Sequence, residues 1–204
     1  MVTMKTSATH RRNSAFSLVE LLVVVGLIAL LTALAVPAIS SVSGGSAVTR
    51  AGQLVADQFS LARQEATGKN REVQVRFVWK DEAPAGYKGV QLWQPSATNV
   101  TEYRPVTRIA WMPEGTMISS AAMLSPLINN PTIPETNAVL PGRGPTKYCG
   151  FRFRSGGGTD LNFNSTNNFV TIVQSRDSTA TTAPTNYAFV QVDPVNGRTR
   201  TYRP

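Results

Sequence analysis

An almost uninterrupted apolar segment near the N-terminus is the feature that most limits how this chain folds. Residues 16–39 read FSLVELLVVVGLIALLTALAVPAI and contain one charged side chain, Glu20. As an α-helix these 24 residues extend about 36 Å, which exceeds the roughly 30 Å hydrocarbon core of a bilayer. A secretory signal peptide has a shorter apolar region followed by a small-residue cleavage site. The sequence therefore predicts one transmembrane helix over residues 16–39.

Positive charge is concentrated at the two ends of the chain. Residues 1–15 contain three basic and no acidic residues, and residues 143–204 contain eight basic and three acidic residues. The positive-inside rule predicts a cytoplasmic basic leader over residues 1–15, a single pass through the inner membrane, and an extracytoplasmic domain. The basic C-terminal third is suited to phosphate polymers or anionic lipid, and a solvated sheet face accounts for the same charge.

Glu20 is out of place in an apolar helix. A carboxylate inside a membrane costs about 2–4 kcal/mol, so it requires a partner. No lysine or arginine lies within two helical turns of Glu20 in the sequence. The partner is then a group from another chain, the chain's own N-terminus after processing, or the headgroup region reached by snorkelling.

Residues 14–24, SAFSLVELLVV, resemble the processing and methylation site of type IV prepilins and type II secretion pseudopilins. The resemblance implies that a prepilin peptidase cuts between Ala15 and Phe16 and methylates the new amine of Phe16. It also implies that Glu20 neutralises the N-terminal amine of a neighbouring subunit and that the helix bends at Pro37. The family usually has glycine before the cut, where this chain has Ala15.

Residues 40–68 are expected to continue the helix as an amphipathic segment, and residues 69–204 to form an antiparallel sheet. Small and apolar residues recur every three or four positions from Val48 to Ala66, which predicts a face packed on that sheet. Period-two alternation and turn residues predict strands at 71–80, 87–94, 101–112, 151–154, 169–174, 187–192 and 198–203. Six prolines predict mostly loop with short ordered pieces over residues 113–149. The expected fold class is α+β, with a long N-terminal helix on an antiparallel sheet.

This layout, with ARQEA at residues 62–66, resembles the GspH/FimT kind of minor pilin. A closer likeness is to the Verru_Chthon cassette protein D family of prepilin-type proteins. The segments that carry it are AGQ at 51–53, VRF at 75–77, FRFR at 151–154, GTD at 158–160 and DPVNGRTRTYRP at 193–204. The resemblance implies a pilin-like fold and an assembly role.

Enzymatic chemistry has little support in the sequence. The chain has one histidine, His10, and one cysteine, Cys149, which excludes a disulfide framework and argues against a triad or a histidine or cysteine metal centre. The glycines at 156–158 lack the Lys-Ser/Thr of a phosphate loop, so a hairpin turn is expected. Cys149 is either a small buried side chain or pairs between chains. We expect no enzymatic activity, no cofactor and no metal site.

The C-terminal strand offers a second interpretation. Arg198 and Arg200 are two residues apart in a strand, so they point the same way, and Arg203 follows them. Guanidinium groups on one exposed face suit phosphate contacts, and Gly-Arg-x-Arg resembles the DNA-contacting tail of pilins in DNA uptake. Related pseudopilins without a nucleic-acid role end in a similar hairpin. The sequence favours a subunit that assembles with other pilin-like subunits into a pilus or secretion pseudopilus, over a pilus-borne DNA-binding module.

Overall fold

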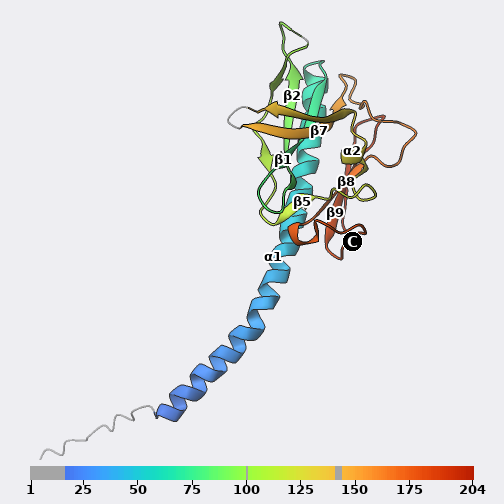
Figure 1. Ribbon diagram of the computed structural model, residues 1–204. Helices are drawn as coiled ribbons and strands as arrows, with labels where there is room; N and C mark the ends of the chain where they lie inside the picture. The colour runs from blue at the N-terminus through green and yellow to red at the C-terminus, as the bar shows by residue number, and fades with distance from the viewer. Residues whose placement is uncertain (1–16, 100, 141–143) are drawn as a thin grey trace, which may run out of the picture. The chain divides into compact units, whose positions relative to one another are not determined.

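The computed structural model describes the backbone of residues 17–99, 101–140 and 144–204, and the side chains of these residues except 34–44. The chain forms two compact units that divide between Val42 and Ser43. A single 51-residue helix, α1 (Leu18–Gly68), contributes to both units (Figure 1). Its backbone is helical through Pro37 and through the glycines at 44 and 45, and the bend that the resemblance implied at Pro37 stays a prediction.

The first unit leaves its apolar side chains exposed. Eleven large apolar side chains between Leu18 and Leu31 are 43–79% exposed, and they occupy every side of the helix. Within the residues that the structure describes, no helix combines the length and hydropathy that a membrane crossing requires. The transmembrane span over residues 16–39 stays a prediction.

The second unit contains two antiparallel sheets. The larger sheet has the strand order β3 (Tyr103–Pro105), β2 (Gly86–Pro95), β1 (Val73–Lys80), β7 (Pro145–Phe153), β6 (Ile133–Val139), with β4 (Ala110–Trp111) also paired to β2. The smaller sheet has the order β10 (Thr199–Tyr202), β9 (Tyr187–Val192), β8 (Phe169–Gln174), β5 (Thr116–Ile118). A short helix, α2 (Pro126–Asn129), and a 3₁₀ turn, Ser175–Asp177, complete the unit. The helix followed by antiparallel sheets confirms the predicted α+β, pilin-like fold (Figure 1).

The second half of α1 packs on both sheets along the predicted stripe. The side chains of Val48, Ala51, Val55, Phe59, Ala62 and Ala66 are fully buried. The Phe59 ring meets the rings of Phe77 and Phe151 edge-on, with centroids 6.0 and 5.3 Å apart. Gly52 brings the helix close to the smaller sheet, because a Cβ there would lie 3.2 Å from the Cβ of Ala188. Helix and sheets therefore share one core.

The ordered pieces expected in the region 113–149 are three strands and a helix among its described residues. Between its loops the region contains β5, α2, β6 and the first part of β7. Pro134 lies at the register shift between Ile133 and Thr136 in an edge strand, and Pro145 is the first residue of β7. These are the positions at which a strand tolerates the missing N–H of proline. The expected strand 101–112 is split into β3, which ends at Pro105, and β4.

The second face of the larger sheet is covered around Arg76. This side chain is only 6% exposed, and its guanidinium lies 4.1 Å from the ring centroid of Trp93 and 4.3 Å from that of Tyr148. Its Nε and Nη2 donate to Gln74 Oε1 at 2.9 and 2.7 Å. Burial lowers the pKa of Arg76. The alternation of β1 places Arg76 on the face opposite Val75 and Phe77, and this face packs into a second, aromatic core.

Candidate functional site

The start of α1 positions Glu20 at the third helical residue. The N–H of Glu20 donates to Ser17 Oγ at 3.3 Å, so Ser17 caps the helix. Serine followed three residues later by glutamate is the sequence pattern of a capping box, a local signal for a helix start at Leu18 rather than at Phe16. The cleavage and methylation site at Ala15 and Phe16 lies outside the described residues, as does the side chain of Pro37.

The Glu20 carboxylate projects from a helix surface that is otherwise apolar. Within the described ranges it forms no ion pair and no side-chain hydrogen bond. Thr32, a polar side chain further along this stretch, donates its hydroxyl to the carbonyls of Ile28 and Ala29 at 3.0 and 2.9 Å. The helix satisfies the Thr32 hydroxyl internally, whereas the Glu20 carboxylate has no hydrogen-bond or ion-pair partner within the described residues.

The C-terminal hairpin between β9 and β10 is built by Asp193. Its carboxylate accepts hydrogen bonds from the N–H groups of Val195 and Asn196 at 2.9 and 3.3 Å, and from Asn196 Nδ2 at 2.7 Å. The hydrogen bond from Val195 N, then those from Asn196 and the nearby charge of Arg200, lower the pKa of Asp193. Gly197 closes the turn with a φ of 66°.

This hairpin packs against the glycine turn that follows β7. The N–H and hydroxyl of Thr159 both donate to the carbonyl of Pro194, at 2.9 and 3.2 Å. A Cβ on Gly158 would lie 2.5 Å from the carbonyl oxygen of Val195, and a Cβ on Gly197 would overlap the carbonyl oxygen of Gly157. The glycines at 156–158 therefore form a turn, as predicted, and Gly157 and Gly158 pack directly against the C-terminal hairpin.

The hairpin presents Arg198 and Arg200 on the same side, as predicted. Both side chains are exposed, and both line a cavity of about 250 Å³ whose walls also include Phe163, Gln191 and Val195. Neither guanidinium donates a hydrogen bond or forms an ion pair within the described residues. Arg203 lies apart from them, with its Nη2 donating to Asn186 Oδ1 at 3.2 Å.

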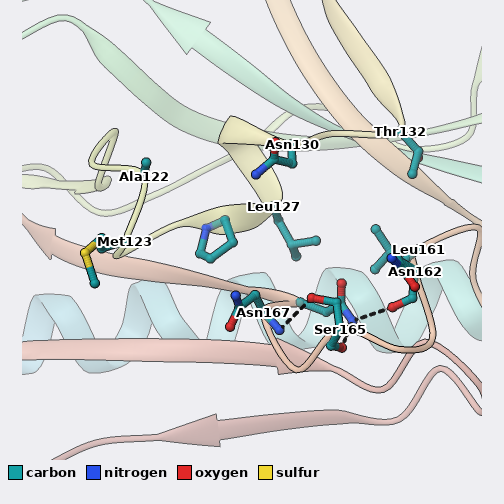
Figure 2. A pocket seen from close by; sticks show the side chains of 11 residues that line it. Ala122, Met123, Leu127, Asn130, Thr132, Leu161, Asn162, Ser165 and Asn167 are labelled. Carbon is teal, nitrogen blue, oxygen red and sulfur yellow. Dashed lines mark hydrogen bonds between the residues drawn. The ribbon is translucent and has the colours of Figure 1, made fainter.

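A larger cavity of about 490 Å³ adjoins this one and was not predicted. It lies between the segment around α2 and the loop that follows β7, and Figure 2 shows Met123, Leu127 and Asn130 on one wall and Asn162 and Ser165 on the other. Its walls come from segments about 40 residues apart in the sequence. No local pattern links such segments, so sequence reasoning had no signal for this cavity.

The remaining candidates are structural. Cys149 is fully buried in β7 beside Phe151, which confirms the buried-side-chain interpretation, and burial raises its pKa to about 12. Trp93 is 7% exposed, and Trp79 and Trp111 are half-buried in packing contacts. Across the part of the chain that the structure describes, no cluster of histidine, cysteine or acidic side chains is able to hold a metal ion.

Comparison with known proteins gives one match, at the N-terminus. The prokaryotic N-terminal methylation motif matches residues 10–36, a range that includes Ala15, Phe16 and Glu20. No curated protein and no solved structure matches the chain. The motif lies over the first half of α1, where the apolar side chains are exposed and Glu20 has no partner within the described residues. The chain therefore carries the motif of prepilin-type proteins, and this indicates a structural, pilin-like subunit rather than an enzyme.

Proposed function

We propose that this protein is a membrane-anchored pilin-like subunit that assembles with other pilin-like subunits into a pilus or a secretion pseudopilus. A prepilin peptidase cuts between Ala15 and Phe16 and methylates the new N-terminus. The N-terminus is cytoplasmic before processing, and the unit from Ser43 to Pro204 lies outside the cytoplasm. The observation that carries the proposal is the methylation motif at residues 10–36, placed on a helix whose apolar side chains are exposed all round.

The exposed helix supports assembly for a physical reason. A helix that is apolar on every side is stable only when lipid or other apolar helices surround it. Side chains such as Leu18 and Leu31, 79% and 65% exposed, find no cover in the described part of their own unit. Transfer from membrane to filament replaces lipid by neighbouring helices, so the same residues serve both states.

Glu20 supplies the specific contact in this proposal. Its carboxylate costs about 2–4 kcal/mol in an apolar environment, and an ammonium group from a neighbouring subunit offsets that cost. Processing creates such a group at Phe16. The chain's own amine, about one helical turn away, competes for the same carboxylate.

The subfamily is proposed on narrower grounds. We assign the chain to the GspH/FimT-like group, with its closest likeness to the Verru_Chthon cassette protein D family. Three of the segments that carry this likeness contain glycines at closely packed positions: Gly52, Gly158 and Gly197. These segments support a common fold and give no support to a particular cargo.

DNA capture through Arg198 and Arg200 is the less favoured alternative. Duplex DNA is bound by cations spread along the phosphate backbone. Here two guanidinium groups share one cavity whose other walls are amides, hydroxyls, apolar groups and the carboxylate of Asp193. Arg203 is engaged with Asn186, away from the pair.

Processing and assembly are tested separately. Mass spectrometry of the protein from its native membrane is expected to give an N-terminus at methylated Phe16, and an intact Met1 would refute the prepilin assignment. Glu20→Gln keeps the shape of the side chain and removes its charge. We expect this variant to be processed and membrane-inserted, with its incorporation into filaments reduced at least about tenfold.

The matched control for Glu20→Gln is Asp57→Asn. Asp57 is exposed on the second half of α1 and accepts a hydrogen bond from Gln53 Nε2 at 2.8 Å. Loss of this charge is expected to leave incorporation unchanged. Normal incorporation of Glu20→Gln would show that Glu20 snorkels and makes no contact between subunits.

A further inference from the structure

Exposed apolar side chains gather around one loop of the second unit, residues 162–168. Met123, Phe163 and Val195 are 83%, 73% and 71% exposed. Met123 lines the cavity of about 490 Å³, which we call the amide pocket. Phe163 and Val195 line the cavity of about 250 Å³, which we call the arginine pocket. Such concentrations of exposed apolar surface mark interaction sites.

The two pockets adjoin each other. Ser165 and Asn168 line both, so the 162–168 loop is their common wall. Asn168 is 6% exposed and fixes this loop, because its Nδ2 donates to the carbonyls of Asn162 and Ser165 at 3.3 and 2.7 Å. A ligand that lies across the 162–168 loop therefore contacts both pockets without any movement of the loop.

The amide pocket is suited to a polypeptide backbone. Its buried apolar walls are Leu127 and Leu161, and its rim carries the side-chain amides of Asn130 and Asn167 (Figure 2). Neither of these amides makes a side-chain hydrogen bond to another described residue. A carboxamide donates and accepts at once, which matches the N–H and C=O of a peptide unit.

The arginine pocket favours a ligand that carries negative charge at one end. Arg198 and Arg200 are without an ion pair within the described residues, and the nearby Asp193 is held by its own turn through Val195 and Asn196. Guanidinium groups bind carboxylates through two parallel hydrogen bonds. Because the amide pocket contains no charged side chain among its described walls, the complementary ligand is charged at one end and neutral along the rest.

We propose that these two pockets bind an extended peptide segment of a partner polypeptide, with apolar side chains followed by one or more carboxylates. The apolar side chains lie against Met123 and Leu127 in the amide pocket, and the acidic end meets Arg198 and Arg200. A nucleic acid carries charge along its whole length and leaves the neutral pocket unexplained. This binding site goes beyond assembly through α1 and does not depend on it.

The test uses the full chain in lipid nanodiscs and a displayed library of random 12-residue peptides. We expect enrichment, relative to empty nanodiscs, of peptides that combine apolar residues with aspartate, glutamate or a free C-terminal carboxylate. Fluorescence anisotropy then measures the affinity of the most enriched peptide. The double variant Arg198→Ala/Arg200→Ala is expected to weaken binding by about tenfold or more. Met123→Ser is expected to weaken it several-fold.

The matched control is Arg71→Ala/Arg108→Ala, which removes two exposed guanidinium groups elsewhere in the unit that have no ion pair within the described residues. This change is expected to alter the affinity less than twofold. An unchanged melting temperature shows that each variant is folded. Three results overturn the proposal: no enriched peptide, an affinity that the Arg198→Ala/Arg200→Ala change leaves intact, or enriched peptides without acidic groups. Stronger binding of a 20-nucleotide DNA, lost in the same double variant, also overturns it and assigns the surface to nucleic acid.

Discussion

Replacing Gly197 by alanine tests whether the C-terminal hairpin is held by interlocked glycine turns. Two costs add at this position. The φ of 66° lies in the left-handed region, which costs a residue with a Cβ about 1–2 kcal/mol. The new Cβ also overlaps the carbonyl oxygen of Gly157, and forcing atoms into a packed site costs about 1–3 kcal/mol. We expect Gly197→Ala to lower the free energy of unfolding by about 2–5 kcal/mol.

Three other glycines separate the two costs. Gly115 has a φ of 75°, and no atom lies within 4 Å of the place that a Cβ would take, so Gly115→Ala carries the backbone cost alone. Gly158→Ala has an ordinary φ and meets the carbonyl oxygen of Val195 at 2.5 Å, so it carries the contact cost alone. Gly156→Ala carries neither and is expected to change stability by less than about 0.5 kcal/mol.

The assay is chemical denaturation of fragment 46–204, followed by tryptophan fluorescence. We expect the loss for Gly197→Ala to be close to the sum of the losses for Gly115→Ala and Gly158→Ala. Equal, small losses for Gly197→Ala and Gly115→Ala would show that the hairpin makes room for the Cβ at no cost. That result would contradict the idea that the C-terminal hairpin and the glycine turn after β7 are interlocked.

Three further predictions concern the second unit. Fragment 46–204 is expected to be soluble and monomeric with cooperative unfolding, and its aggregation during gel filtration would contradict helix-on-sheet packing within one unit. Arg76→Ala is expected to cost about 2–4 kcal/mol by emptying the space between Trp93 and Tyr148, whereas Arg76→Met fills that space and is expected to lose less than half as much in the same denaturation assay. The lowered pKa of Asp193 means that its charge stabilises the fold above the unfolded pKa and that this contribution is lost as the pH falls through the folded pKa. The melting temperatures of the wild type and Asp193→Asn should therefore converge as the pH is lowered from about 5 to about 2, and a constant difference would count against the charged turn.

Much of the fold was predictable because it follows short-range periodicity. The strands at 169–174 and 187–192 have the bounds that alternation predicted, and the helical stripe from Val48 to Ala66 is the buried one. In each case a two- or four-residue repeat records which face meets the core. The N-terminal motif is equally local, so its residues were recognisable without a structure.

The features that were missed depend on partners distant in the sequence. β6 is a strand because its backbone pairs with β7, and that pairing outweighs the local signal of its proline. The burial of Arg76 depends on Trp93 and Tyr148 from two other strands. The amide pocket likewise needs the loops around Met123 and Leu161 to meet. A sequence pattern indicates on which face of a helix or strand a residue lies. It does not indicate which other segments cover that face.

The two halves of α1 differ in how their apolar side chains are covered. This difference separates the segment that we propose for assembly from the unit that we propose binds a peptide. In the second half the buried apolar residues lie along one face of the helix, and the chain's own sheets cover that face. In the first half the apolar residues occupy all sides, and their side chains are exposed within the described residues. Apolar contacts between such helices are compatible with many lengthwise registers. In the proposed filament, Glu20 is the single charged side chain between Leu18 and Leu31, so a bond between its carboxylate and a neighbouring amine selects one register.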